Sequence, residues 1–370
     1  MKASTIDRRQ FLTHTATGAA GLAAAGLSFS ALAQSKSTTV GIIYVGSRND
    51  FGWSQAHAVA AKALSQIPGV KVVEEENVPE TTAVRKTLEA MVLSDGASLV
   101  FGTSFGYFDP FMVDMAKKYP KVEFRHTTAL WSADKHPMNL GGYFNYLDQA
   151  HYVNGIAAGL STTSNKIGYV AAKSIPLVAR TINAFAMGVR KVNPNAVVQL
   201  VMTGEWSAPV REAEATNTLI SAGCDVIACH VDSPKIIIEI AERKGVKTLG
   251  HNASQANLAP KGFITGAEHK WETVYKSFAN KIAAGEKLPN IFYGGYDKDM
   301  VQSTPFGAGA SDKSRNAANI AIADLKAGKP IYTAAVKSNT GKIVIDKGYG
   351  NYDPYLERMD YLVEGVIGSL

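Results

Sequence analysis

The chain has 370 residues, of which 46% are hydrophobic and 19% are charged, and its formal net charge is +6. Its basic residues are scattered and form no Lys/Arg run interleaved with aromatic side chains, which argues against a nucleic-acid-binding protein. The two cysteines, Cys224 and Cys229, are separated by a strand-like segment that holds them about 16 Å apart, so we expect packed thiols and no disulfide between them.

The first 33 residues predict an export signal. Residues 7–12 (DRRQFL) form a twin-arginine pattern, residues 16–32 are weakly apolar and rich in alanine and glycine, and an A-x-A cleavage pattern ends at Ala33. We therefore expect cleavage near Ala33 and a mature protein in the bacterial periplasm. No later stretch approaches about 18 apolar residues in a row, so we expect no membrane span after the signal.

Residues 40–64 predict a strand, a loop and the start of a helix. An apolar β-branched run is followed by a polar turn and then by alanine and valine at helical spacing. Ligands in open α/β sheets bind beyond the carboxyl ends of strands, so residues 48–53 are a candidate ligand loop. The alternative is that Trp53 packs in a core and Asp50 only caps the helix.

Further apolar runs alternate with helix-period segments along the chain. The runs are residues 70–73, 98–101, 122–124, 167–171, 197–202, 225–229 and 247–249, and the helical segments are residues 81–93, 107–119, 148–160, 177–192, 209–222 and 234–244. This alternation predicts a doubly wound α/β chain with parallel sheets. The length exceeds what one core usually carries, so we expect two domains, with the first boundary near Tyr143.

Three more loops follow predicted strands and precede predicted helices. They are residues 102–107, 203–207 and 229–233. Together with residues 48–53 they place two loops in each domain, rich in aromatic and hydrogen-bonding side chains. If the two domains oppose the carboxyl ends of their strands, these loops form a ligand clamp.

Trp53 and Trp206 occupy equivalent loop positions in the two halves, beside small or acidic neighbours. Two opposed indoles can sandwich a flat ring, and each stacking contact contributes about 0.5–1.5 kcal/mol beyond burial. The alternative is that both tryptophans are packing residues at the surface of their domains. Phe105 and Tyr107 carry the same two interpretations.

Residues 102–106 match G-x-S-x-G, the nucleophile elbow of α/β-hydrolases. A triad would also need Asp232 and either His251 or His269. The pattern is weak in a chain with 33 glycines, and Ser104 precedes any insertion long enough to form a lid. A periplasmic serine hydrolase using Ser104 is therefore the alternative from another functional class.

Seven segments in order along the chain resemble a single family. They are DFGWSQ from Asp50, AKKYPKVEF from Ala116, YVNGIAAGL from Tyr152, KIGYV from Lys166, VNPN from Val192, AGCDVI from Ala222 and MDYLVEGVIG from Met359. The mature chain is similar along its length to the basic membrane protein (BMP) family of ABC-transporter solute receptors, which includes purine-nucleoside receptors.

The resemblance implies a two-lobed periplasmic-binding-protein fold of the first type, in which each lobe is a doubly wound parallel sheet flanked by helices. Residues 36–143 with 268–295 would form lobe one, and residues 144–267 with 296–350 would form lobe two. The tail, residues 351–370, would pack across both lobes.

The resemblance also implies a site between the lobes. The two aromatic residues that sandwich the purine in nucleoside receptors correspond to Trp53 and Trp206. Where those receptors have G-x-D-x-D and S-x-x-K, this chain has residues 250–254 (GHNAS) and 266–269 (GAEH). The groups expected to hold ribose are replaced, which favours a nucleobase over a nucleoside.

We therefore expect a monomeric receptor, not an enzyme, that binds an adenine-like purine base and delivers it to an inner-membrane ABC permease. We expect no cofactor and no metal ion. Asp232 and Asn252 would read the polar edge of the base, with Ser47 or Asp50 contributing from the other lobe. The alternatives are a purine-nucleoside receptor, and a purely structural role in which Asp232 caps a helix and Asn252 holds a turn.

Overall fold

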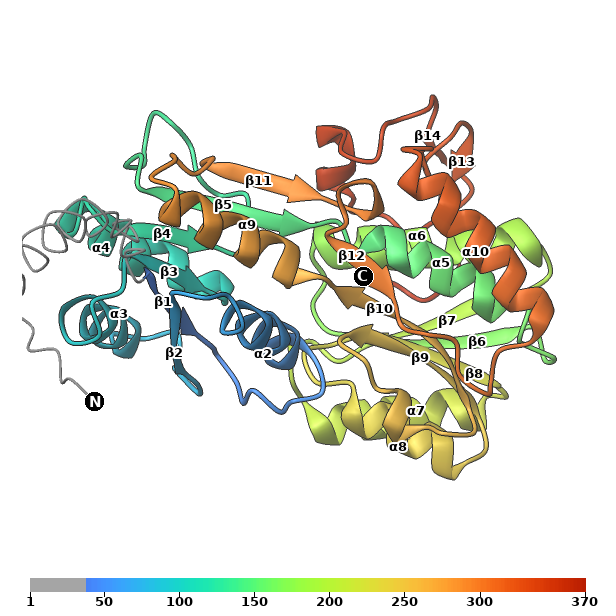
Figure 1. The fold of residues 1–370 in the computed structure, drawn as a ribbon. Helices are drawn as coiled ribbons and strands as arrows, with labels where there is room; N and C mark the ends of the chain where they lie inside the picture. The colour runs from blue at the N-terminus through green and yellow to red at the C-terminus, as the bar shows by residue number, and fades with distance from the viewer. Residues whose placement is uncertain (1–37) are drawn as a thin grey trace, which may run out of the picture. The chain divides into compact units, whose positions relative to one another are not determined.

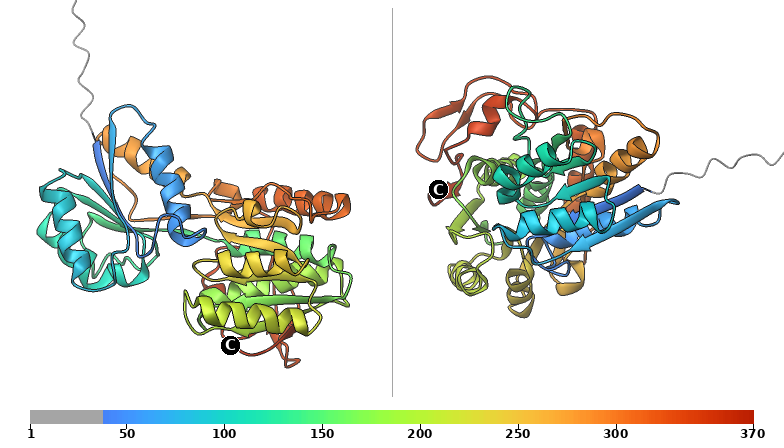
Figure 2. Two further views of the ribbon diagram at one scale, coloured as in Figure 1. Left: turned by 90° about the horizontal axis from the view of Figure 1, so that it is seen from below. Right: turned by 90° about the vertical axis from the view of Figure 1, so that its left-hand side faces the viewer.

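The computed structural model describes residues 38–370, so the predicted export signal and its cleavage point lie outside the described residues. The described chain forms two mainly parallel β-sheets, and helices cover both faces of each sheet (Figures 1 and 2). The predicted two-lobed α/β fold is therefore confirmed. Lobe one is the part built on the first sheet, and lobe two is the part built on the second.

Lobe one contains a parallel sheet with the strand order β11-β5-β4-β3-β1-β2. Its strands are β1 (Thr38–Ile43), β2 (Val70–Glu75), β3 (Leu99–Gly102), β4 (Glu123–His126), β5 (Leu140–Asn145) and β11 (Ile291–Gly294). Its helices are α2 (Trp53–Leu64), α3 (Ala83–Leu93), α4 (Val113–Lys118) and α9 (Trp271–Ala283). The chain runs from β1 outward to β2 and then back to β3, so the strand order reverses between β1 and β3.

Lobe two contains a sheet with the strand order β12-β10-β9-β8-β6-β7-β15, in which β12 pairs antiparallel with β10. Its strands are β6 (Lys166–Ala171), β7 (Val197–Met202), β8 (Val226–His230), β9 (Lys247–Asn252), β10 (Phe263–His269), β12 (Val301–Ser303) and β15 (Val366–Ile367). Its helices are α5 (Asp148–Gly159), α6 (Pro176–Val192), α7 (Pro209–Ser221), α8 (Lys235–Arg243) and α10 (Asp312–Lys326). Here the order reverses between β6 and β8. A short hairpin of β13 (Val336–Lys337) and β14 (Ile343–Ile345) follows α10.

The central strands are buried on both faces, as their continuous apolar sequences predict. In β1, Val40, Ile42 and Ile43 have no exposed surface, and β8 is buried along its whole length. The cysteines Cys224 and Cys229 are buried free thiols, which confirms the prediction for both.

One predicted helix is shorter than expected. The apolar pattern predicts a helix over residues 107–119, but regular helix begins only at Val113. Asp109 has an extended backbone (φ −120°, ψ 127°), because the residue before a proline avoids the helical region, and Pro110 has no N–H to donate. Tyr107 consequently belongs to a separate 3₁₀ turn, Phe105–Tyr107.

The chain passes between the lobes at three places. It passes from β5 to α5, returns from β10 to α9, and passes again from β11 to β12. On its return, α9 packs against α2, where Trp271 and Phe278 are buried in the same cluster as Val40 and Ala60. The carboxyl-end loops of the two sheets are therefore joined by short connections.

The tail after residue 350 packs mainly on lobe two. Its buried apolar residues join the cluster of α5 and α6, and β15 pairs with β7. These residues are Leu356, Met359, Leu362, Val363 and Val366. Tyr352 instead meets β11 of lobe one, where its ring centroid lies 5.3 Å from that of Tyr293. No helix within residues 38–370 is long and apolar enough to cross a membrane.

Candidate functional site

The candidate site lies where loops follow the strands at which each sheet reverses its order. In doubly wound sheets this reversal opens a crevice at the carboxyl ends of the strands, where ligands bind. In lobe one the predicted loops 48–53 and 102–107 follow β1 and β3. In lobe two the predicted loop 229–233 follows β8, at the reversal, and the predicted loop 203–207 follows β7, the strand that pairs with β6.

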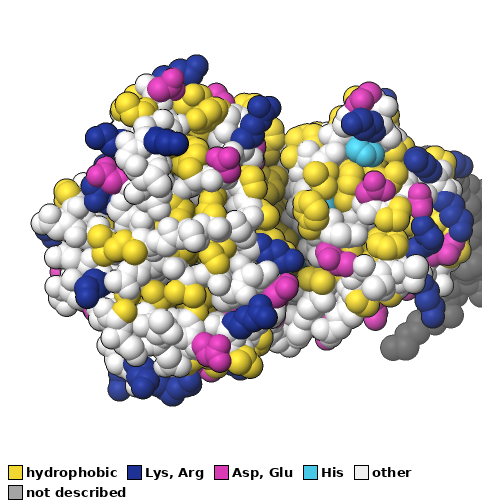
Figure 3. Space-filling view, turned by 180° about the vertical axis from the view of Figure 1, so that it is seen from behind, with side chains coloured by type: hydrophobic (Ala, Val, Ile, Leu, Met, Phe, Trp, Pro, Cys, Tyr) yellow, Lys and Arg dark blue, Asp and Glu magenta, His cyan; other side chains and the backbone are white. Residues whose placement is uncertain are grey.

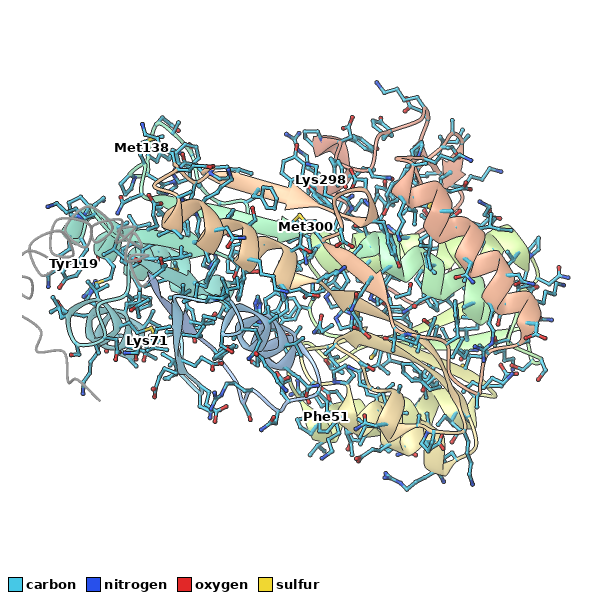
Figure 4. The ribbon with its side chains drawn as sticks, in the orientation of Figure 1. Phe51, Lys71, Tyr119, Met138, Lys298 and Met300 are labelled. Carbon is cyan, nitrogen blue, oxygen red and sulfur yellow. The ribbon has the colours of Figure 1, made fainter. Side chains whose placement is uncertain are left out.

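The loop before α2 is bonded directly to lobe two. The Trp53 amide donates a hydrogen bond to the carbonyl oxygen of Asp232 (2.8 Å), and the Ser233 hydroxyl donates to the carbonyl of Asp50 (2.6 Å). The side-chain amide of Gln255 donates to the carbonyl of Phe51, which is labelled in Figure 4. These bonds hold the loops of the two lobes together at the candidate site.

Gly52 makes this close approach possible. A Cβ atom at this position would lie 1.8 Å from the carbonyl oxygen of Asp232 and 2.8 Å from Cδ of Pro234. Both distances are far below van der Waals contact, and the nearer atom is backbone that cannot rotate away. Any side chain at residue 52 would therefore force the two loops apart.

Asp232 connects the two tryptophans that the sequence singles out. Its carbonyl accepts from the Trp53 amide (2.8 Å), and its amide donates to the carbonyl of Trp206 (2.7 Å). The Trp53 indole N–H donates to the carbonyl of Thr103 (2.7 Å), which fixes the ring at the end of β3. Both tryptophan side chains are partly exposed. The structure thus joins the backbones of Trp53 and Trp206 through one residue.

The Asp232 carboxyl makes no hydrogen bond with another residue of the described chain. Burial raises the pKa of this carboxyl to about 8, and the nearby carboxylates of Asp50, Glu212 and Glu80 add to the shift. A carboxyl that titrates near neutral pH can donate a hydrogen bond when protonated and accept one when ionised. Asp232 is therefore the predicted polar contact whose side chain remains available.

Asp50 and Ser47 have local partners. The carboxylate of Asp50 accepts from the amides of Gly52 (2.8 Å), Ser54 (2.8 Å) and Gln55 (2.9 Å), so it caps α2 with both oxygens. This is the capping role that the sequence left open as the alternative. The Ser47 hydroxyl accepts from the amide of Asn49 (3.3 Å) in the turn after β1.

Asn252 adopts the turn-holding position that was its alternative. Its backbone is left-handed (φ 68°), a conformation that asparagine tolerates better than most residues, and its side chain is 3% exposed. The side-chain amide donates to the carbonyl of Val231 (3.3 Å). Asn252 thereby supports the loop that carries Asp232.

Tyr107 and Phe105 do not share one environment. Tyr107 has no exposed surface, packs in the core of lobe one and donates its hydroxyl to the carbonyl of Val78. This placement contradicts the predicted ligand contact of Tyr107, because the 3₁₀ turn before Pro110 directs the ring inward. Phe105 is 67% exposed on the same turn.

The Ser104 hydroxyl is not arranged as a nucleophile. It donates to Oε1 of Glu80 (2.6 Å), which also accepts from the Gly106 amide (2.7 Å). His126 Nε2 lies 2.7 Å from the Ser104 carbonyl oxygen, so it does not act on the hydroxyl. Within residues 38–370 no histidine bonds to this hydroxyl, whereas a serine nucleophile requires a general base there. The triad that the hydrolase alternative needs is not assembled.

A cluster of five histidines lies beside the tryptophans, and the sequence analysis did not predict it. We define the histidine cluster as His57, His151, His230, His251 and His269. His151 Nε2 and His251 Nδ1 are 2.8 Å apart, and the rings of His230 and His251 are 4.4 Å apart. Little histidine surface is visible on the face shown in Figure 3. The sequence did contain a signal for this cluster: β8 and β10 end in histidine, and the penultimate residue of β9 is also a histidine.

We expect the free energy of unfolding to fall as the pH drops from about 7 toward 4. Burial lowers the pKa of His230 to about 4 and that of His269 to about 3. It also lowers the pKa of His57, His151 and His251 well below the usual range. The unfolded chain takes up these protons near pH 6.5 and the folded chain does not, so the stability present above about pH 6.5 is lost as the pH falls toward the folded pKa.

Asp232 acts in the opposite direction. Because its pKa is raised to about 8 in the folded chain, its contribution is full below about pH 4 and is lost as the pH rises through 8. Urea unfolding at about pH 7.5, 6 and 4.5 measures the sum of the histidine and Asp232 contributions to the free energy of unfolding. Because five histidines oppose one carboxyl, we expect the histidine contribution to dominate. A stability that stays constant or rises on acidification would contradict the neutral, buried state of the cluster.

No group of three or more His, Cys, Asp or Glu side chains in residues 38–370 is arranged to hold a metal ion. Three histidines of the cluster bond to other aromatic side chains instead. His151 bonds to His251 and to the hydroxyl of Tyr169 (3.1 Å), and His57 Nδ1 bonds to the hydroxyl of Tyr275 (2.8 Å). These contacts are hydrogen bonds between neutral aromatic groups.

Comparison with known proteins agrees with this architecture. The family described as "ABC transporter substrate-binding protein PnrA-like" (Bmp) matches residues 37–314. The chain is 32% identical over 335 residues to a protein of Brucella abortus named "purine-binding protein", covering 90% of this chain and 93% of that protein. It is also 32% identical over 274 residues to a "putative ABC transporter glucose-binding protein" of Haloferax volcanii, covering 74% of this chain and 68% of that protein.

Solved structures share the fold. A solute-binding protein of an ABC transporter system from Conexibacter woesei has a TM-score of 0.68 at 23% identity, covering 79% of this chain and 97% of that one. A second, from Aeropyrum pernix, has a TM-score of 0.65 at 17% identity, covering 81% and 93%. The family match over residues 37–314 confirms the resemblance seen in the sequence, and the chain belongs to the PnrA-like (Bmp) family of ABC transporter substrate-binding proteins.

Proposed function

We propose that this protein is a periplasmic receptor that binds a purine base between its lobes and presents it to an inner-membrane ABC permease. Its family consists of solute-binding receptors that work with a membrane permease, and its Brucella relative is named a purine-binding protein. The observation that carries the proposal is that the backbones of Trp53 and Trp206 both bond to Asp232, one to its carbonyl and one to its amide. A flat heterocycle stacked between the indoles would present its polar rim to that carboxyl.

A purine suits this combination of groups. Its faces are aromatic and its rim alternates N–H donors with ring-nitrogen acceptors. The indoles supply stacking surface, and the Asp232 carboxyl can donate or accept because its pKa is raised to about 8. Burying the rim without partners would cost more than the stacking contributes, so a polar group at this point is required.

The side chains near the site favour a base over a nucleoside. Both oxygens of Asp50 are occupied by the α2 amides, and Tyr107 is buried in the core. Glu268 lies in the segment that replaces the family's S-x-x-K pattern, and its carboxylate accepts from Gln302 (2.9 Å) and from Thr304. These groups are satisfied within the protein, so they offer little to ribose hydroxyls.

We expect free purine bases to bind more tightly than their nucleosides. Adenine, guanine or hypoxanthine should bind with a dissociation constant between about 10 nM and 10 μM, roughly −11 to −7 kcal/mol. A thermal-shift screen followed by calorimetric titration would compare the bases with adenosine, guanosine and inosine, and with glucose as the competing ligand class. Stronger stabilisation by nucleosides would contradict the base assignment, and stabilisation by glucose alone would contradict purine binding.

We expect no catalytic turnover to depend on Ser104. Its hydroxyl is bonded to Glu80 and has no histidine base among the described residues, so Ser104→Ala should alter binding by at most about 1–3 kcal/mol. Ester and nucleoside substrates would be incubated with the wild-type protein and the variant. Any hydrolysis that Ser104→Ala abolishes would overturn the receptor assignment.

A further inference from the structure

Three neighbouring parallel strands carry histidines to the edge of the candidate site. β8 ends at His230, β10 ends at His269, and His251 is the penultimate residue of β9. β8 pairs with β9 and β9 pairs with β10, all parallel, so their carboxyl ends lie at one edge of the sheet. This edge also carries Asp232, the proposed polar contact of the ligand.

Each proposed stacking tryptophan has one of these histidines beside it. The His230 ring lies 6.1 Å from that of Trp206, tilted by 35°. The His269 ring lies 5.3 Å from that of Trp53, nearly perpendicular at 88°, and stacks on Trp271 at 4.5 Å. His230 and His269 thus flank the tryptophan pair from lobe two.

These two histidines differ from the rest of the cluster in their hydrogen bonds. His151, His251 and His57 each have at least one ring nitrogen bonded to a neighbouring side chain. In His230 and His269 no ring nitrogen bonds to another described residue, and their Nδ1 atoms are buried; Nε2 of His57 is also buried without a partner. Buried polar atoms in native proteins are normally paired, so an unpaired one next to a binding site indicates a missing partner.

The surroundings keep both imidazoles uncharged. His230 is faced by His251 from β9 and by His151 from α5, and His269 is faced by Trp53, Trp271 and, through Trp271, by His57 of α2. The charged groups that act on the same edge at Asp232 are Asp50, Glu80, Glu212 and Lys173. Burial lowers the pKa of His230 to about 4 and of His269 to about 3, and the His230 ring adds to the shift at His269. A neutral imidazole has one N–H donor and one acceptor nitrogen.

We propose that His230 and His269 bind the ligand directly as neutral imidazoles, and that they select uncharged heterocyclic bases over anionic ligands such as nucleotides. The inference rests on the proposed purine-binding function and names the residues that determine its ligand specificity. Two neutral rings offer donors and acceptors that alternate as they do on a purine rim. They offer no positive charge to a phosphate or a carboxylate.

Four variants test the inference, with hypoxanthine and its nucleotide IMP as probes. His230→Leu and His269→Leu remove both ring nitrogens, whereas His230→Asn and His269→Asn keep an amide near the position of Nδ1. We expect each leucine variant to lose about 5- to 100-fold in affinity for hypoxanthine. Each asparagine variant should lose less than half as much binding free energy as the leucine variant at the same position. His136→Asn, outside the cluster, is the control and should bind like the wild type.

The pH dependence separates direct binding from a structural role. Hypoxanthine does not titrate between about pH 7 and 3.5, so a fall in its affinity over this range reports protonation of the protein. Because the pKa values of His230 and His269 are about 4 and 3, we expect the fall below about pH 4.5. We expect a fall for the wild type and a flatter profile for the double variant His230→Asn/His269→Asn. If a leucine variant does not fold, as judged by its melting transition, the asparagine variants and the pH profile still test whether the two histidines bind the ligand.

Three failures are distinguishable. If the wild type binds hypoxanthine and all four variants retain its affinity and pH profile, this inference is wrong and the receptor function stands. If the wild type binds IMP more tightly than hypoxanthine, the selection against anions is wrong. If the wild type binds no purine base, the proposed function itself fails.

Discussion

Replacing Trp53 or Trp206 with alanine should weaken the binding of a purine base by about 2–4 kcal/mol, because stacking and the burial of apolar surface are both lost. The backbone of each tryptophan bonds to Asp232, and each tryptophan is only partly buried, so part of its surface is free to meet a ligand. Calorimetric titration with adenine measures the change directly. Trp53→Phe and Trp206→Phe keep a flat ring and should lose less.

The tryptophan variants need a control because Trp53 also contributes to the fold. Its indole donates to Thr103 and packs edge-on against His57 at 4.9 Å. Trp131 is a suitable control, since its indole donates to the Pro137 carbonyl in a loop of lobe one away from the histidine cluster. Trp131→Ala should leave affinity unchanged. Unchanged affinity in both Trp53→Ala and Trp206→Ala would contradict the sandwich.

The second large effect is expected at Gly52. Alanine there would place its Cβ 1.8 Å from the Asp232 carbonyl oxygen, so the loop before α2 could no longer meet lobe two. The three hydrogen bonds that join the loops would be lost, at about 0.5–1.5 kcal/mol each, and the backbone of Trp53 would no longer be bonded to Asp232. We expect the affinity for a base to fall by at least about 2 kcal/mol, with the separate lobes still folded.

Gly348→Ala is the matched control, because a Cβ at that exposed glycine meets nothing within 4 Å. Calorimetry measures the affinity of both variants, and small-angle scattering with saturating adenine measures their compactness. Gly52→Ala should remain more extended than Gly348→Ala. If Gly52→Ala binds and compacts like the wild type, the contact between the loops is not required for binding.

Individual strands show which parts of the fold could be predicted from the sequence. The strands β1, β3 and β8 were predicted from continuous apolar runs, because a parallel strand covered by helices on both faces is mostly apolar. β5 was missed because its sequence, LGGYFN, contains two glycines, which weaken a strand signal. Gly142 is needed there, since a Cβ would lie 1.8 Å from the Thr128 carbonyl oxygen.

In the loops, the sequence predicted what depends on neighbouring residues and failed where a contact with more distant residues decides. The sequence placed Trp53, Trp206 and Asp232 after strands, which is a local property of apolar runs followed by turns. It could not choose between ligand contact and capping for Asp50, because the choice depends on whether the amides of α2 reach the carboxylate. It misassigned Tyr107, because helical spacing continues through Pro110 in the sequence but not in the backbone.

By itself the sequence predicted a doubly wound α/β chain and the loops that follow its strands, because hydrophobic periodicity and turn residues are written in consecutive positions. The family and the two-lobed fold were predicted from the resemblance of seven segments. Only the tertiary structure decided which side chains in those loops are free. Asp232 meets Trp53 across 179 positions of the chain only after β1 and β8 are placed in their separate sheets. The histidine cluster likewise exists because parallel pairing of β8, β9 and β10 aligns three strand ends, and long-range strand pairing leaves no periodic signal in the sequence.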